Sequence, residues 1–123
     1  MQNDKEKFKK DFIERLIQFS VRIINLTEEL KKEKAPLSII DQLIRSSTSV
    51  GANIVEAKAS SSKKEYTNFF QIALKSANET KYWLILTKES FPQIAERVDW
   101  FLKEIDEISK IIGSSILTLK SKK

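Results

Sequence analysis

The chain contains 123 residues with a formal net charge of +5, and it has neither cysteine nor histidine. The missing cysteine excludes disulfides and thiolate chemistry, and the missing histidine removes the commonest general base and metal ligand, so we expect no catalytic residue, metal or cofactor. Two glycines, two prolines and 32% charged residues favour a single domain over residues 1–123, built from long helices with short connections.

The first predicted helix covers residues 4–33 and carries a regular apolar stripe. The members of the stripe recur at spacings of three or four residues: Phe8, Phe12, Leu16, Phe19, Ile23, Leu26 and Leu30. Ile13, Ile17 and Ile24 widen the stripe, as expected for a helix in a bundle. Pro36 ends the helix, because proline disfavours helical backbone in the residue before it.

The second predicted helix covers residues 38–59, with Ser38 as its N-cap. One face of this helix is expected to be core: Ile40, Leu43, Ser47, Val50, Ile54 and Ala57. A second face, which we name the polar stripe, follows the same spacing on the far side: Gln42, Arg45, Ser49, Asn53 and Glu56.

Residues 46–51 are poor helix formers and lose about 3 kcal/mol of intrinsic helix propensity relative to alanine. We therefore predict that the second helix is packed on two sides, with its own core on one side and a second subunit against the polar stripe. The alternative is that the polar stripe is a solvated face. Such faces usually carry long lysine and glutamate side chains, which are nearly absent between Arg45 and Glu56.

The third predicted helix covers residues 62–89 and begins at a capping box formed by Ser62 and Glu65. Its core face is expected to hold Tyr66, Phe69, Phe70, Ala73, Ala77, Thr80, Leu84 and Thr87. A neighbouring line mixes small, charged and aromatic residues in the manner of the polar stripe: Ile72, Ser76, Glu79, Trp83 and Leu86. From this line, Ser76, Glu79 and Trp83 are predicted to join the subunit interface.

The fourth predicted helix covers residues 91–119, with Ser90 and Gln93 as a second capping pair and Pro92 in the first turn. It has the most regular apolar repeat in the chain: Ile94, Val98, Phe101, Ile105, Ile108, Ile112, Ser115 and Leu119. Trp100 lies off this repeat and either covers a neighbouring subunit or lies on the surface.

Four long helices with short loops indicate an all-α fold, an antiparallel up-down-up-down four-helix bundle. In that topology the N-terminus, the second loop and the C-terminus meet at one end, which we name the lysine pole: Lys5, Lys7, Lys9, Lys10, Lys58, Lys63, Lys64, Lys120, Lys122 and Lys123. Lysines attract phosphate chains by releasing their counterions, so we predict nonspecific binding of RNA or DNA at this pole. The alternative is that these lysines only keep a small domain soluble.

Other chemistry finds little support in the sequence. Ser62 is explained by its capping role, and Gly51 lacks the lysine and second glycine of a phosphate-binding loop. Glu56 and Glu79 could face each other, but carboxylate di-metal bundles also need a Glu-x-x-His motif. No apolar run reaches eighteen residues and no hydrophobic segment follows the charged N-terminus, so we expect a cytoplasmic protein without membrane contact.

Two segments, QLIRSSTSVGANIVEA and FFQIALKSANET, resemble the signature of the four-helix proteins encoded by intervening sequences of bacterial 23S ribosomal RNA genes. The accessory variability protein of diversity-generating retroelements shares that fold. The matching positions are Gln42, Arg45, Ser49, Asn53, Ile54, Glu56, Phe69, Ala73, Ser76 and Glu79. Ala57 departs from the pattern, because the family commonly has glycine there.

The resemblance implies a ring-like homopentamer of four-helix protomers with a basic surface. For the retroelement members it also implies binding to nucleic acid and to a reverse transcriptase. Two functional hypotheses follow for this chain. It is either an oligomeric, nonspecific RNA- or DNA-binding protein, or an adaptor that binds a nucleic-acid-handling protein and does not itself contact nucleic acid.

Overall fold

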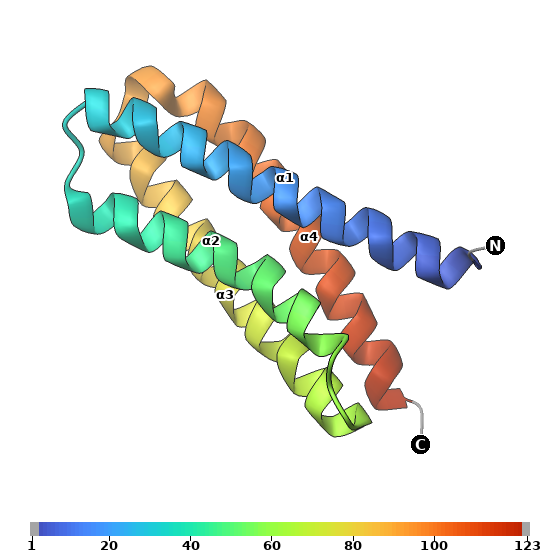
Figure 1. Cartoon of the computed structure of the whole chain (residues 1–123). Coiled ribbons are helices and arrows are strands. Elements are labelled where there is room, and N and C mark those ends of the chain that lie inside the picture. Colours follow the sequence, from blue (N-terminus) through green and yellow to red (C-terminus); the bar gives the residue numbers. More distant parts are fainter. Residues whose placement is uncertain (1–2, 122–123) are drawn as a thin grey trace.

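The computed structural model describes residues 3–121, which form four long helices and one short 3-10 turn (Figure 1). The elements are α1 (Asp4–Lys32), α2 (Leu37–Ala57), α3 (Lys63–Ser90), η1 (Pro92–Ile94) and α4 (Ala95–Ser121). The chain alternates in direction from each helix to the next, which confirms the predicted all-α, four-helix fold (Figure 1). None of the helices within this described part is both long enough and apolar enough to cross a membrane.

The turn between α1 and α2 is closed by backbone hydrogen bonds. Lys34 adopts a left-handed backbone with φ of 60°, and its N–H donates to the carbonyl of Lys31. The N–H of Ala35 donates to the carbonyl of Leu30 at 2.9 Å, so two of the last carbonyls of α1 find donors. Pro36 then occupies the N-cap of α2, and the prediction of Ser38 as N-cap is wrong because Ser38 already lies inside the helix.

Of the two capping residues predicted later in the chain, Ser62 is confirmed and Ser90 is wrong. The hydroxyl of Ser62 accepts a hydrogen bond from the N–H of Glu65 at 3.1 Å, as predicted. Ser90 is not a cap, because α3 continues through it and the N–H of Phe91 still donates to the carbonyl of Thr87. Pro92 lies at the start of the short turn η1, where its missing N–H costs nothing.

The core is formed by the apolar stripes of all four helices. Its fully buried members include Phe19, Ile23, Leu30, Leu43, Val50, Leu84, Val98, Ile105, Ile108 and Ile112. The predicted widening of the α1 stripe is wrong at two positions, since Ile17 is 53% and Ile24 47% exposed. These two side chains point away from the helices that pack on α1.

Phe8 was also expected in the core and is instead 56% exposed. The cause is a mismatch of helix lengths, because α1 has 29 residues and α2 has 21. A methyl group placed on Gly51 would lie 3.4 Å from the Cβ of Leu16, so in the antiparallel pair Ala57 lies level with about Lys10. Phe8 therefore lies beyond the end of α2.

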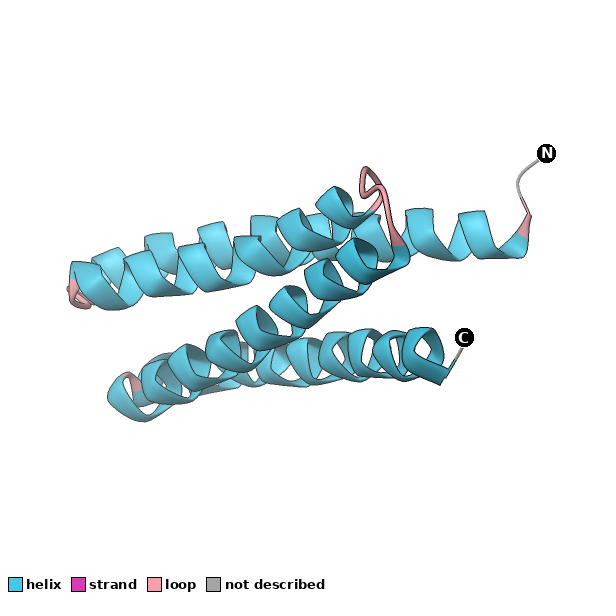
Figure 2. Ribbon diagram, turned by 90° about the horizontal axis from the view of Figure 1, so that it is seen from below, coloured by secondary structure: helices cyan, strands magenta, loops and turns pink. Residues whose placement is uncertain are grey.

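Helices α1 and α4 are joined by side chains. The rings of Phe19 and Phe101 meet edge to face with centroids 5.8 Å apart. The guanidinium of Arg15 donates two hydrogen bonds to Glu104, at 2.7 and 2.8 Å, and a third to Glu107 at 2.6 Å. Beyond these contacts the first turns of α1 and the last turns of α4 lie apart at the same end of the molecule (Figures 1 and 2).

Candidate nucleic-acid interface

The lysine pole brings together three segments that are far apart in sequence. The start of α1, the loop between α2 and α3 and the end of α4 lie at one end of the bundle (Figure 1). Eight of the ten predicted lysines lie in the described part of the chain and all eight are exposed: Lys5, Lys7, Lys9, Lys10, Lys58, Lys63, Lys64 and Lys120. Lys122 and Lys123 lie outside the described residues.

Two hollows open at this pole. The first, which we name the aromatic groove, has a volume of about 830 Å³ and is lined by Asp4, Lys5, Phe8, Lys9, Tyr66, Phe70, Lys110, Ile111, Ser114, Ser115, Thr118 and Leu119. The second, which we name the loop hollow, has a volume of about 440 Å³ and is lined by Lys63, Lys64, Thr67, Asn68, Gln71, Leu119 and Lys120. Leu119 borders both hollows, so they adjoin.

The predicted lysines divide between these hollows and the outer surface. Lys5 and Lys9 line the aromatic groove. The loop hollow takes Lys63, Lys64 and Lys120. Lys7, Lys10 and Lys58 border neither hollow and lie on the outside of the pole. Phosphate groups could therefore be met both inside the hollows and around them.

Aromatic side chains from α1 and α3 line the aromatic groove. The ring of Tyr66 stacks on that of Phe70 with centroids 4.9 Å apart, and the ammonium of Lys9 lies 5.6 Å from the Tyr66 centroid. The ring of Phe8 stacks on that of Phe12 at 6.3 Å with only 15° between their planes. Cations and aromatic rings thus line the same groove, an arrangement that can bind both phosphates and flat aromatic groups.

Sequence reasoning assigned only Lys5 and Lys9 of the groove's lining to the nucleic-acid site, and it missed Phe8, Tyr66 and Lys110 among others. Phe8 and Tyr66 were assigned to the core, since their spacing fits the apolar stripes. Lys110 was not assigned at all, because it lies four residues after Asp106 and forms an ordinary helix-surface ion pair with it at 3.1 Å. The available signal was the excess length of α1, which leaves its first turns without α2 beside them.

Ion pairing differs between the two ends of the bundle. At the end opposite the lysine pole, Arg97 pairs with Glu29, Lys31 with Glu28 and Lys88 with Asp99. A hydrogen bond and the nearby charge of Asp99 raise the pKa of Lys88, and Glu29 raises the pKa of Arg97 in the same way. Within residues 3–121, the ion pairs of the structure include none of Lys5, Lys7, Lys9, Lys10, Lys58, Lys64 and Lys120.

The polar stripe of α2 makes hydrogen bonds inside its own protomer. The hydroxyls of Ser49 and Ser76 lie 2.9 Å apart, and the amide of Asn53 donates to the carbonyl of Ser49 at 2.7 Å. In the same interface, the buried hydroxyl of Thr80 donates to that of Ser46 at 3.0 Å. Contact with α3 therefore supplies part of the stabilisation that the serine-rich helix needs.

The remaining predicted interface residues lie nearer the surface. Ser76 is buried, Gln42, Ser49, Asn53 and Trp83 are half-buried, and Arg45, Glu56 and Glu79 are exposed in the protomer. The indole Nε1 of Trp83 is buried and has no hydrogen-bond partner among the described residues. A role for these residues between subunits stays a prediction.

Comparison with known proteins assigns the family. Residues 9–114 match the family model described as "23S rRNA-intervening sequence protein". This chain belongs to that family. The resemblance read from its second and third helices is thereby confirmed, and the relation to the retroelement accessory protein stays a prediction. No curated protein matches the chain.

A solved structure supports both the family and the fold. It is the crystal structure of a protein of unknown function from the S23 ribosomal protein family of Bacteroides thetaiotaomicron. It superposes with a TM-score of 0.82 at 36% sequence identity, over 88% of this chain and 96% of that one. The four-helix arrangement of this chain is thus close to that of the solved relative.

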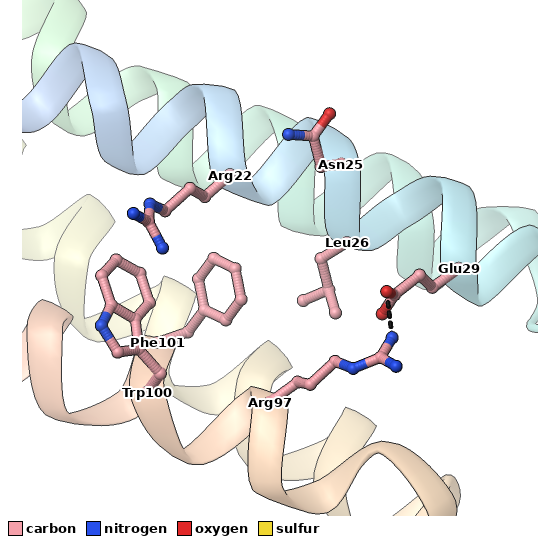
Figure 3. A pocket seen from close by; sticks show the side chains of 7 residues that line it. All are labelled: Arg22, Asn25, Leu26, Glu29, Arg97, Trp100 and Phe101. Atoms are coloured by element: carbon pink, nitrogen blue, oxygen red, sulfur yellow. Dashed lines mark hydrogen bonds and ion pairs between the residues drawn. The ribbon is translucent and has the colours of Figure 1, made fainter.

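This family member has one further hollow, which we name the arginine cleft (Figure 3). It has a volume of about 310 Å³ and is lined by Arg22, Asn25, Leu26, Glu29, Arg97, Trp100 and Phe101. The guanidinium of Arg22 lies over the ring of Trp100, 4.5 Å from its centroid, and Arg97 points to Glu29 (Figure 3). Because Glu29 neutralises Arg97, the cleft attracts anions less than the lysine pole does.

The described part of this family member contains no candidate metal site. Within residues 3–121, no group of three or more acidic side chains converges in the manner of metal ligands. Glu56 and Glu79, the pair considered from sequence, are both exposed.

Proposed function

We propose that this 23S rRNA-intervening sequence protein is a non-enzymatic, oligomeric protein that binds RNA or DNA without sequence preference through its lysine pole. The observation that carries the proposal is the gathering of lysines around two adjoining hollows, most of them without an acidic partner among the described residues. Each lysine that neutralises a phosphate releases a counterion, and this entropy gain supplies sequence-independent affinity.

Oligomerisation is part of the same proposal. The resemblance implies a homopentamer, and the exposed side chains of Arg45, Glu56 and Glu79 are suited to polar contacts across a subunit boundary. A ring would carry several lysine poles. Linked sites of this kind bind one long polynucleotide far more tightly than a single site does.

A second candidate is an adaptor that binds a nucleic-acid-handling protein, such as a reverse transcriptase. Exposed apolar side chains favour it, since protein partners commonly cover such patches. Ile17 and Ile24 on α1 and Tyr82 and Ile85 on α3 are each at least 47% exposed. In this alternative the lysines serve solubility.

The two candidates are separated by binding of labelled oligonucleotides at increasing salt. The test variant replaces Lys58, Lys63 and Lys64 together with glutamine, and the matched control replaces Lys31, Lys32 and Lys34 at the opposite end. We expect the affinity of the wild type to fall steeply with salt. In a plot of the logarithm of the association constant against the logarithm of the salt concentration, the slope should be about −0.7 to −0.9 for each phosphate contacted. The test variant should bind more weakly with a shallower slope, and the control should match the wild type.

Salt-insensitive or absent binding would contradict the nucleic-acid proposal. A tight complex with a protein partner that persists after nuclease treatment would support the adaptor instead. The ultraviolet absorbance ratio of the purified protein gives an independent reading of any nucleic acid that copurifies with it.

A further inference from the structure

We propose that the aromatic groove takes a single-stranded polynucleotide, with a base stacked on the exposed ring of Phe8 and its phosphates on the lysines around it. This inference rests on the proposed function and adds to it the class of nucleic acid, the place where bases enter and the residue that receives them.

The exposed ring is the first observation. Phe8 is 56% exposed because α1 extends beyond the end of α2, and its ring lies nearly parallel to that of Phe12 with centroids 6.3 Å apart. An aromatic side chain in water loses the stabilisation that burial would give it, about 25 cal/mol per Å² of apolar surface. A flat base covering the ring would restore that contact, and base–aromatic stacking is tolerant of sequence.

The position of the lysines is the second observation. Lys5 and Lys9 lie three residues before and one after Phe8, and both line the groove that Phe8 lines. Lys110 reaches the same groove from α4, on the far side. Asp4 is the one carboxylate in the lining and Lys110 is paired with Asp106 at 3.1 Å, so the groove keeps a net positive charge from Lys5 and Lys9 and is complementary to a polyanion.

The adjoining loop hollow is the third observation. It continues from Leu119 with Lys64 and Lys120 and with the polar side chains of Asn68 and Gln71. A chain leaving the aromatic groove would therefore meet further cations and hydrogen-bonding groups along its path. This is the arrangement of a single-strand site, in which a positively charged track follows the backbone and rings receive the bases.

A duplex fits this arrangement poorly. Its bases are already paired and stacked inside the helix, so Phe8 could reach them only after unstacking, which costs a few kcal/mol for each step. A fatty acyl chain fits less well too, because the groove also carries the hydroxyls of Ser114, Ser115 and Thr118. The volume of about 830 Å³ lies in the range that holds a small organic molecule and has room for an unstacked nucleotide.

The experiment measures fluorescence anisotropy of labelled oligo(dT), oligo(U) and a DNA duplex of equal length with the wild type, Phe8→Ala, Phe8→Trp and Leu117→Ala. Leu117 is the matched control, because it is 71% exposed on α4 and lines neither hollow. We expect Phe8→Ala to weaken single-strand binding about tenfold, the loss of one stacked base, and to leave duplex binding and the salt slope within twofold. Phe8→Trp should keep or improve single-strand binding, and Leu117→Ala should match the wild type.

Equal losses of single-strand and duplex affinity in Phe8→Ala, or no loss in either, would overturn the inference. A fatty-acid probe gives a second contradicting outcome. If oleate displaces a fluorescent fatty acid from the wild type but not from Phe8→Ala, while Phe8→Ala binds oligonucleotides as the wild type does, the occupant is an acyl chain and the inference is wrong. Circular dichroism checks that each variant keeps its helices, and since Phe8 lies beyond α2 we expect no change. If the wild type binds no polynucleotide, the proposed function itself fails; if the lysine variants lose binding and Phe8→Ala does not, only the present inference falls.

Discussion

The hydroxyl of Thr80 on α3 donates to the hydroxyl of Ser46 on α2 across 3.0 Å, in an interface where Thr80 is fully buried and Ser46 is 4% exposed. The same hydroxyl lies 2.8 Å from the carbonyl of Ser76 in its own helix. Together with the contact between Ser49 and Ser76, this pair places a row of small polar side chains between α2 and α3. The two helices can therefore approach closely while their hydroxyls stay satisfied.

Thr80→Val keeps the shape of the side chain and removes its donor. We expect it to destabilise the protein by about 1 to 3 kcal/mol, because the buried hydroxyl of Ser46 loses its partner. Urea unfolding measures the loss, and adding Ser46→Ala should recover part of it, as a double-mutant cycle would show. Thr118→Val is the control: Thr118 is exposed and donates only within α4, so its change should stay within about 0.5 kcal/mol. Equal effects in the two variants would mean that the interface bond contributes nothing.

The α2–α3 contact also shows where sequence reasoning ends. The poor helix propensity of residues 46–51 predicted a second subunit against the polar stripe, and this stays a prediction. Within the protomer, the hydroxyls of Ser49 and Ser76 lie 2.9 Å apart across the α2–α3 contact. Spacing along one helix cannot say whether the neighbour is α3 of the same chain or another subunit. That choice depends on which faces the topology turns toward each other.

The core was predictable, because burial on one side imposes a spacing of three and four on every helix. The same spacing rule misassigned Phe8 to the core, because the spacing within one helix does not show where a neighbouring helix ends. The ion pair between Arg15 and Glu104 was missed for a different reason. The two residues are 89 positions apart, and isolated charges on a helix surface give no sign of their partner.

Glu104→Gln tests that ion pair through its pH dependence. The hydrogen bonds from Arg15 hold the pKa of Glu104 below its ordinary value of 4.5, against the opposing effect of partial burial. A carboxyl whose pKa is lowered in the folded state stabilises the fold above its unfolded pKa, and the contribution is lost as the pH falls through the lower folded value. We therefore expect Glu104→Gln to cost about 1 to 2 kcal/mol at pH 7 and to flatten the loss of stability below about pH 4.5.

Thermal unfolding from pH 7 down to pH 2 measures this effect. Glu107→Gln is the matched control, since Glu107 is 52% exposed and takes one hydrogen bond from Arg15, whereas Glu104 is 16% exposed and takes two. The control should lose less stability. If Glu104→Gln and the wild type lose stability equally between pH 4.5 and pH 2, the lowered pKa of Glu104 does not contribute to the pH dependence of stability.

The two glycines of the chain allow a comparison of helix propensity with packing. A methyl group on Gly113 of α4 would meet nothing within 4 Å, whereas one on Gly51 of α2 would lie 3.4 Å from Leu16. Gly113→Ala should therefore stabilise the protein by about 1 kcal/mol, close to the full difference in helix propensity. Gly51→Ala should gain less, because Leu16 must shift slightly. The urea concentrations at the unfolding midpoints show which variant is more stable. A larger gain in stability for Gly51→Ala than for Gly113→Ala would show that the α1–α2 contact is looser than the structure indicates.

Assembly is best tested at exposed members of the polar stripe. Asn53 donates to Ser49 inside the protomer, so Asn53→Leu would disturb folding and assembly together. Arg45 and Glu56 are exposed and form none of the ion pairs found within residues 3–121, so Arg45→Ala and Glu56→Ala leave the protomer intact. If a second subunit covers them, removing one partner of a buried charge pair costs about 3 to 5 kcal/mol and dissociates the assembly.

Sedimentation velocity then gives the decisive reading. We expect the wild type to sediment as a multiple of the 14.2 kDa chain, and both variants to shift toward the single chain with unchanged circular dichroism. Lys103→Ala, an exposed position on α4 outside the predicted interface, should sediment as the wild type does. A wild type that sediments as one chain removes the reason for predicting a subunit against the polar stripe. The α2–α3 hydrogen bonds would then be the whole explanation of its serine-rich sequence, and the polar stripe would be a solvated face.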